Sequence, residues 1–295
     1  MSNVIMETVS KLTEVTPQPE DFVGEDDLLY CGKCRTPKQQ YFPEWARIPG
    51  MDRHPVDCDC EKVQRLKREA EELRRKHRAA VEERRRHCFS NGRMTSWNFE
   101  NDNGNTPQMD YARRYVQNWD KVQSDNIGYY LWGDPDCGKS YLAACIANGL
   151  LEKEVSVRMT NFTAILNDLS ERFEGRNDYI EYLCRYPLLI IDDLGTERGT
   201  EYALEHVYNV IDSRYRSGKP LILTANISPD VLNNPPDMAH ARIYSRILEM
   251  CVPIHVTGVQ NRKATAQRKM DTLKSMMNES PSSVEKQFRS FLCSE

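Results

Sequence analysis

Eight consecutive residues, Gly133 to Ser140, have types and spacing that suit the binding of phosphates. Their sequence, GDPDCGKS, matches the pattern G-x-x-x-x-G-K-[ST]. The glycines let backbone N–H groups curl around a phosphate without a Cβ in the way. Lys139 supplies a positive charge to the β- and γ-phosphates, and the Ser140 hydroxyl is a ligand for Mg²⁺. The residues predicted to bind the nucleotide are Gly133, Asp134, Pro135, Asp136, Cys137, Gly138, Lys139, Ser140 and Tyr141.

The neighbours of this loop match the context that such a loop needs. A β-prone run at 127–132 precedes it, and residues 141–150 follow with helical periodicity. The phosphates would then lie at a helix N-terminus, where the helix dipole favours anions. The side chains of Asp134 and Asp136 are expected to point outward, because they carry the same sign of charge as the phosphates.

Two later apolar runs end in polar residues that could act on the same nucleotide. The run at 188–191 is followed by Asp192 and Asp193, and the run at 221–225 is followed by Asn226. In a parallel sheet the carboxyl ends of the strands line the ligand crevice, so these side chains should lie beside the phosphate loop. Asp192 is expected to hold the Mg²⁺ shell, Asp193 to orient or deprotonate an attacking water, and Asn226 to contact the γ-phosphate.

Four cysteines form a second group with ligand spacing. Two residues separate Cys31 from Cys34, as in zinc ribbons, and Cys58 and Cys60 form a tighter C-x-C pair. About 30 residues enclose too small a core to fold alone, and a tetrahedral Zn²⁺ would supply the missing stability. A redox pair or unrelated thiols are the alternatives. The remaining cysteines are predicted to be packing residues: Cys88, Cys137, Cys145, Cys184, Cys251 and Cys293.

The helices and strands that must position these groups are predicted to form an α/β fold. Short apolar runs alternate with segments of helical periodicity, and the runs are continuous rather than alternating in polarity. This pattern indicates a parallel sheet covered by helices on both faces. The predicted strands are 127–132, 155–159, 188–192, 220–224 and 253–256.

Charge and composition divide the rest of the chain. Residues 1–30 read as an acidic, flexible leader, residues 31–60 as the zinc-binding unit and residues 61–93 as a basic helix. The α/β domain is expected over 94–262, followed by a weakly ordered tail over 263–295.

The basic helix carries a short apolar seam at Val63, Leu66, Ala70 and Leu73. Three interpretations stay open: a solvated helix with a packing stripe, a helix that pairs with a partner protein, or one that lays Arg84–Arg86 on phosphate.

Overall composition excludes some classes of function. The 295 residues include 40 basic and 44 acidic side chains, so the net charge of -4 predicts no general attraction to nucleic acid. No stretch approaches eighteen consecutive apolar residues, which excludes a membrane-spanning helix. The first residues lack the pattern of a secretion signal, so we expect a cytoplasmic protein.

Taken in order, the loop at 133–140, LLIIDD at 188–193, LTAN at 223–226 and RIYSRI at 242–247 resemble the motifs of AAA+ ATPases. Within that class the stretch from about residue 95 to 262 looks most like the DnaC/DnaI-type replicative helicase loaders, particularly those of phages and prophages. The resemblance makes Gly133–Ser140 Walker A, Asp192 and Asp193 Walker B, and Asn226 sensor 1. It makes Arg242 or Arg246 the arginine finger that reaches a neighbouring subunit's nucleotide.

The residues themselves support the arginine assignment only in part. Arg242 and Arg246 are four apart and share a helix face, from which they could bridge to a carboxylate, grip DNA or reach a γ-phosphate. The chain also departs from the class in two ways. First, Asp193 stands where many members have Glu, so hydrolysis should be slow or partner-dependent. Second, the residues after Arg246 are too few for a full helical lid, and Arg262 is the nearby candidate for the sensor 2 arginine.

The resemblance implies an ATP-dependent loader of the hexameric replicative helicase, with ATP, Mg²⁺ and structural Zn²⁺ as cofactors. Residues 1–90 would engage the helicase, and the ATPase domain would form homo-oligomers and bind single-stranded DNA. Alternatives are a transposition helper ATPase of the IstB kind, a nucleotide or nucleoside kinase, and a non-hydrolysing zinc adaptor. The basic side chains considered for DNA phosphates are Arg172, Arg176, Arg214, Arg216 and Lys219.

Overall fold

The computed structural model describes residues 15–46, 52–90, 92–102, 104, 106–172, 174–195, 200–258 and 261–277. The chain divides into an N-terminal unit, residues 1–79, and a C-terminal unit, residues 80–295. The division falls inside helix α2 (Asp59–Cys88), whereas the sequence predicted a boundary near residue 93.

The N-terminal unit begins earlier than the sequence suggested. Strands β1 (Phe22–Val23) and β2 (Leu29–Tyr30) form an antiparallel hairpin, and Leu28 and Leu29 are buried. Residues 21–30 therefore belong to the folded unit, so the prediction of a flexible leader over 1–30 was wrong for this part. Residues 1–14 lie outside the described residues.

A second hairpin and two helical segments complete this unit. Strands β3 (Gln39–Tyr41) and β4 (Arg53–Pro55) pair antiparallel, and η1 (Glu44–Ala46) is a short 3-10 helix. Helix α2 starts with Asp59 and Glu61 in its first turn and ends with basic residues in its last, as the helix dipole favours. The predicted seam stays exposed: Val63, Leu66 and Leu73 are each more than half exposed.

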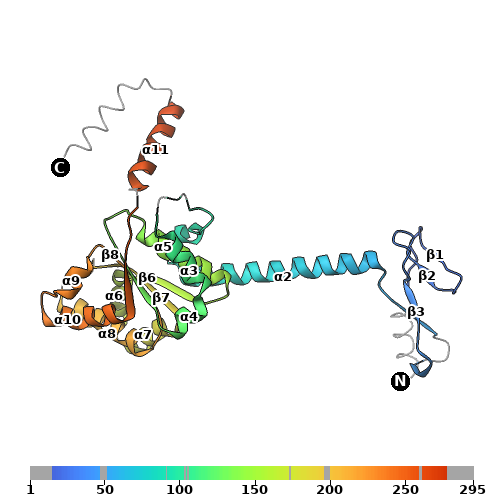
Figure 1. The fold of residues 1–295 in the computed structure, drawn as a ribbon, viewed down its shortest axis with the longest axis horizontal. Helices are drawn as coiled ribbons and strands as arrows, with labels where there is room; N and C mark the ends of the chain where they lie inside the picture. Colours follow the sequence, from blue (N-terminus) through green and yellow to red (C-terminus); the bar gives the residue numbers. More distant parts are fainter. Residues whose placement is uncertain are drawn as a thin grey trace. The chain divides into compact units, whose positions relative to one another are not determined.

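The C-terminal unit is built on a five-stranded parallel sheet, part of which is labelled in Figure 1. The strands are β5 (Gly128–Trp132), β6 (Val157–Asn161), β7 (Leu188–Leu194), β8 (Leu221–Ala225) and β9 (Cys251–His255). Their order across the sheet is β6-β7-β8-β5-β9, with every neighbouring pair parallel. The predicted α/β fold is confirmed, with strand boundaries shifted by at most two residues.

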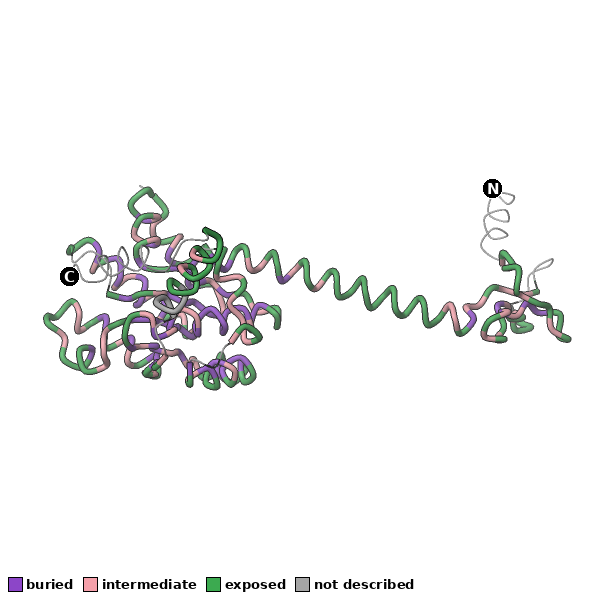
Figure 2. Tube along the Cα trace, turned by 90° about the horizontal axis from the view of Figure 1, so that it is seen from above, coloured by how far each residue is buried: buried purple, intermediate pink, exposed green. Residues whose placement is uncertain are grey.

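Helices cover both faces of this sheet, as the apolar runs require. Successive residues of β7 alternate between two buried clusters: Leu188 and Ile190 face one, and Leu189 and Ile191 face the other. In Figure 2 the buried residues of the C-terminal unit gather in its interior. The first cluster includes α3 (Met109–Gln117), α4 (Trp119–Ser124) and α5 (Lys139–Glu152). The second includes α6 (Phe162–Glu171), α7 (Arg176–Arg185), α8 (Glu201–Arg216), α9 (Pro229–Asn233) and α10 (Met238–Met250).

Two further segments flank this core. The short 3-10 helix η2 (Gly92–Ser96) packs against α5. Helix α11 (Asn261–Met277) occupies much of the predicted weakly ordered tail, which is a correction to that prediction; residues 278–295 lie outside the described residues. Among the described helices, none is long and apolar enough to cross a membrane.

One basic residue considered for DNA proves to be part of the core. Arg214 is fully buried, and its guanidinium donates hydrogen bonds to carbonyl oxygens of the strand-entry loops. The acceptors are Cys184 O, Tyr186 O, Pro187 O and Pro220 O. A buried guanidinium with all these partners cannot reach a DNA phosphate, so that prediction was wrong for Arg214.

Candidate functional site

The loop between β5 and α5 has the backbone shape that its glycines predict. Gly133 has φ 150°, and a Cβ there would lie 2.5 Å from the carbonyl oxygen of Val256. Gly138 has φ 100° and precedes the first residue of α5. Both positions need glycine, because side chains rarely tolerate such angles and the first also lacks space. The loop therefore presents the N-terminus of α5 to the phosphate position.

Lys139 lies inside this loop. Its side chain is 7% exposed, and its Nζ donates hydrogen bonds to Gly133 O at 3.0 Å and Asp134 O at 2.8 Å. These carbonyl contacts hold the ammonium group at the centre of the loop, where phosphate oxygens can become its acceptors.

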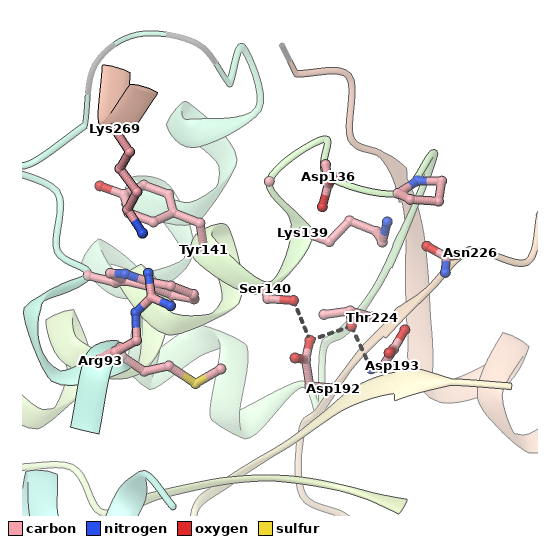
Figure 3. A pocket seen from close by; sticks show the side chains of 14 residues that line it. Arg93, Asp136, Lys139, Ser140, Tyr141, Asp192, Asp193, Thr224, Asn226 and Lys269 are labelled. Carbon is pink, nitrogen blue, oxygen red and sulfur yellow. Dashed lines mark hydrogen bonds between the residues drawn. The ribbon is translucent and has the colours of Figure 1, made fainter. Parts of the chain in front are cut away.

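Three segments that are far apart in the sequence meet next to Lys139 (Figure 3). Ser140 Oγ donates to Asp192 Oδ1 at 2.8 Å, and Thr224 Oγ1 donates to the same oxygen at 2.6 Å. Thr224 Oγ1 also accepts the backbone N–H of Asp193 at 2.8 Å. The structure thus brings the phosphate loop and the ends of β7 and β8 together. Ser140 and Asp192 offer oxygen ligands of the kind that Mg²⁺ prefers.

Asp193 and Asn226 lie on the same side of the cavity as this chain of hydrogen bonds (Figure 3). Asp193 has φ 65°, and the pairing of β7 with β8 shifts register between Ile191 and Leu194. This irregularity turns Asp193 out of the strand, so that its side chain is exposed in the cavity.

The cavity itself has a volume of about 800 Å³ and extends beyond the predicted motifs. Its other side is formed by residues that the sequence analysis did not assign to the site: Arg93, Met94, Trp97 and Lys269. The predicted residue Tyr141 lies there too, with its ring 5.7 Å from the ring of Trp97. No motif marks these positions, because η2 and α11 reach the cavity only through tertiary packing.

Two loop residues differ in where they lie. Asp136 lines the cavity, contrary to the expectation that its side chain points outward, whereas Asp134 is not among the lining residues. Cys137 is buried against the core, in agreement with a filling role, and Pro135 also lines the cavity.

The two arginines of α10 lie away from the cavity and differ from each other. Arg246 Nε donates to Asp212 Oδ1 at 2.7 Å, and its guanidinium stacks over the ring of Tyr208 at 4.9 Å. Arg242 is exposed, and its side chain has no partner among the residues that the structure describes. Helix α10 thus fixes one arginine against α8 and leaves the other open to solvent.

The four cysteines of the N-terminal unit converge. The sulfur atoms of Cys31, Cys34, Cys58 and Cys60 all lie within 4.8 Å of one another. Sulfurs that share a tetrahedral zinc lie about 3.8 Å apart, as follows from a Zn–S bond of about 2.3 Å, so the group needs little adjustment to hold Zn²⁺. Burial raises the pKa of the Cys58 thiol to about 12, and a hydrogen bond with Cys34 raises that of Cys60 to about 11. Hydrogen bonding with Thr36 lowers the pKa of the Cys34 thiol to about 5, so a cation among the sulfurs is needed chiefly to ionise Cys58 and Cys60.

A buried ion pair stabilises the segment that carries these cysteines, residues 31–60, which we call the cysteine knuckle. Lys38 Nζ lies 2.9 Å from Asp21 Oδ2 and 3.4 Å from Glu61 Oε1. Asp21 also accepts the backbone N–H of Gly32 at 3.1 Å. Hydrogen bonds from the backbone of Gln18 and from Lys38 lower the pKa of Asp21 to about 2. The other cysteines in the described part of the chain are buried away from this group, as expected of packing residues, and Cys293 lies outside it.

Comparison with known proteins agrees with this geometry. The chain is 26% identical over 246 residues to the uncharacterised protein YqaM of Bacillus subtilis (strain 168), covering 79% of this chain and 70% of that protein. It is 28% identical over 148 residues to the replicative helicase loader DnaI of the same organism, covering 46% of this chain and 47% of the loader. The chain thus spans about half the length of this loader.

A crystal structure of DnaI has the same fold, with a TM-score of 0.50 and 24% sequence identity, covering 59% of this chain and 94% of that chain. The profile of the IstB-like ATP binding protein family matches residues 61–269, which include η2, the phosphate loop, both acidic residues of β7 and part of α11. With a match over more than half of its length, the chain belongs to the family of IstB-like ATP binding proteins.

Proposed function

We propose that this protein is a cytoplasmic, ATP-dependent loader of a hexameric replicative helicase, acting in the initiation of DNA replication. The observation that carries the nucleotide part is the hydrogen-bonded chain from Ser140 through Asp192 to Thr224 beside Lys139. The loading part rests on the relatives whose names state that role.

In this proposal the protein groups have distinct roles. Lys139 and the backbone N–H groups at the start of α5 hold the β- and γ-phosphates, with Ser140 and Asp192 as the residues that hold Mg²⁺. Mg²⁺ supplies charge neutralisation at the phosphates when bound. Asn226 orients the γ-phosphate, and Asp193 accepts the proton of the attacking water. The shorter side chain of Asp compared with Glu makes this hydrolysis slow until a partner completes the site.

A neighbouring copy would contribute an arginine from α10 to the nucleotide. Arg242 can do so without losing a contact that the structure describes, whereas Arg246 must first leave Asp212. Mixing tests the idea, because each arginine acts in trans. A chain that lacks the finger arginine keeps an intact cavity, so it should regain hydrolysis when mixed with Lys139→Ala chains, which retain both arginines. If mixing does not restore hydrolysis to the Arg242 or the Arg246 variant, that arginine is not the finger.

The helicase would bind the N-terminal unit and α2. The seam of α2 is exposed, and it belongs with the cysteine knuckle to the N-terminal unit. Both are therefore available to a partner without disturbing the fold of the C-terminal unit. Single-stranded DNA would bind the oligomer, with Arg172, Arg176, Arg216 and Lys219 as the remaining basic candidates. Each of them already has contacts within the chain: Arg172 with Tyr179, Arg176 with Leu169 O, Arg216 with Asp212 and Lys219 with Arg185 O.

The family match also supports a second candidate, a transposition helper ATPase of the IstB kind. The cysteine knuckle favours the loader, since it is not expected in those helpers. Affinity capture of the full chain from its native host, with the bound proteins identified, separates the two: a hexameric helicase supports loading and a transposase overturns it.

The nucleotide site is tested by Lys139→Ala. We expect this variant to lose ATP binding by at least about 100-fold, since it removes the charged donor to two phosphates. Its zinc content should stay the same, because Lys139 lies in the other unit. Exposed Lys121 on α4 provides a matched control, Lys121→Ala. Undiminished ATP binding by Lys139→Ala would refute the site.

A further inference from the structure

Asn148 connects three segments of the C-terminal unit. It lies on α5, two turns after Ser140, and is 1% exposed. Its Oδ1 accepts a hydrogen bond from Arg85 Nε at 3.0 Å, near the end of α2. Its Nδ2 donates to Met94 O at 2.9 Å and Trp97 O at 2.8 Å, which belong to η2 and the residue after it. A buried amide is costly unless it is satisfied, so these contacts specify one arrangement.

Other contacts hold the same stretch of chain against the core. Arg85 also pairs with Glu152 on α5 at 2.6 Å, and Phe89 forms an isolated parallel bridge with Met159 in β6. Arg158 donates to the carbonyl oxygen of His87 at 2.7 Å. Residues 85–90 and 92–97 are therefore each held in a defined place beside the phosphate-loop helix.

This attachment places Arg93 in the nucleotide cavity. Arg93 and Lys269 both line the side of the cavity next to Tyr141, opposite Asn226 (Figure 3). Both side chains carry a positive charge, which suits an anionic ligand at this side of the cavity. The aromatic rings of Trp97 and Tyr141 on the same side suit the flat face of a base. The combination of positive charge and rings matches the nucleoside end of a nucleotide with its nearest phosphate.

We propose that Arg93 is a further nucleotide-binding residue outside the sequence motifs, and that Asn148 is the positioning residue that holds it in the cavity. This inference rests on the proposed binding of ATP at Lys139. In this arrangement η2 contacts the end of the nucleotide that lies farthest from Asn226.

Arg93→Ala tests the first half, in the full chain with its zinc. Equilibrium binding of labelled ATP with Mg²⁺ should weaken about tenfold, as for the loss of one charge-assisted hydrogen bond. Arg93→Lys should recover part of the loss because it keeps the charge. The matched control is Arg114→Ala, since Arg114 is exposed on α3 and does not line the cavity. Equal binding by Arg93→Ala and Arg114→Ala would overturn the inference.

Asn148→Asp tests the second half. It keeps an oxygen for Arg85 but removes the donors to Met94 O and Trp97 O. If Asn148 acts through Arg93, the double variant that combines Asn148→Asp with Arg93→Ala should bind ATP no more weakly than Arg93→Ala alone. Additive losses, or a lowered melting temperature with unchanged ATP affinity, would show a merely structural role and overturn the positioning assignment.

The nucleotide site and the role of Arg93 can be refuted separately. If Lys139→Ala still binds ATP, the proposed site is wrong and the inference falls with it. If Lys139→Ala loses binding while Arg93→Ala retains it, the site stands and only the role of Arg93 is refuted.

Discussion

The two units of this protein reach a folded state by different physical routes. In the N-terminal unit, strands of two or three residues enclose a few buried groups, chiefly Leu28, Leu29, Cys31 and Cys58. In the C-terminal unit, a five-stranded sheet separates two apolar clusters that fill both of its sides. A unit with so little apolar core needs another source of stability, and four converging sulfurs provide a place for one. A bound ligand should therefore determine folding in the first unit and function in the second.

Their buried charges show the same contrast. In the N-terminal unit, Lys38 and Asp21 pair beside the cysteines, so the ion pair belongs to the small core itself. In the C-terminal unit, Asp212 on α8 joins Arg246 and Arg216 at the edge of a core that already exists. The first pair supports the segment that carries the four cysteines, and the second group fixes α8 against α10.

The largest expected effect comes from removing the zinc that we propose the four cysteines hold. Chelation or Cys58→Ser should unfold the N-terminal unit, because burying the remaining thiols without a cation offers no comparable stability. Zinc content by atomic spectroscopy and limited proteolysis of residues 15–58 measure this. The thermal transition of the C-terminal unit should not change. The control Cys145→Ala alters a buried cysteine of that unit and should leave zinc content intact. A protease-resistant N-terminal unit after complete chelation would contradict the comparison.

A smaller effect is expected from Thr224→Val. The variant keeps the shape but removes the hydroxyl that joins Asp192 to the backbone N–H of Asp193. Hydrolysis should slow by about 10- to 100-fold, corresponding to the loss of one or two charge-assisted hydrogen bonds, while ATP affinity changes little. Single-turnover hydrolysis and equilibrium binding separate the two quantities. Loss of affinity with an unchanged rate would show that Thr224 only holds the loop.

The arginines of α10 should differ in their effect on stability. Arg246→Ala removes a partner of the largely buried Asp212 and should lower the free energy of unfolding of the C-terminal unit by about 1–2 kcal/mol. Arg242→Ala, its natural control on the same helix face, should change it by less than about 0.5 kcal/mol. Urea unfolding of both variants measures the difference. Equal effects would mean that the contact with Asp212 contributes nothing.

The smallest expected effect is a pH dependence confined to the C-terminal unit. Burial lowers the pKa of His206 below its ordinary value of 6.5. Since the unfolded chain then binds the proton more readily, stability should fall as the pH drops below the unfolded pKa and level off below the folded one. Urea unfolding at about pH 7.5 and about pH 5.5 should show this loss, and His206→Gln should reduce it. An unchanged pH dependence in that variant would assign the titration to another group.

Much of the fold and half of the cavity could be predicted because they depend on local patterns. Continuous apolar runs such as 188–191 cannot be stable unless both faces are covered, so the parallel sheet follows from them. The phosphate loop depends on residues next to each other in the chain, and strand ends meet once the sheet is parallel. Asp192, Asp193 and Asn226 could therefore be placed near Ser140 without coordinates.

Other positions could not be predicted, because their neighbours lie far away in the sequence. Asp21 reads as one more acid of a charged leader, yet its partner Lys38 makes it part of the small core. Arg214 reads as a surface cation, yet carbonyl oxygens of two loops enclose it.

The amino-acid order alone determined the class of fold, the loop for phosphates and the spacing of the sulfur ligands, since each depends on periodicity or on residues a few positions apart. Tertiary packing decided that Thr224 links the two acids, that Arg93 and Lys269 face the cavity, and that Arg246 is held by Asp212. These residues belong to segments from about 30 to more than 170 positions apart, and only the packed core determines which of them meet at one site.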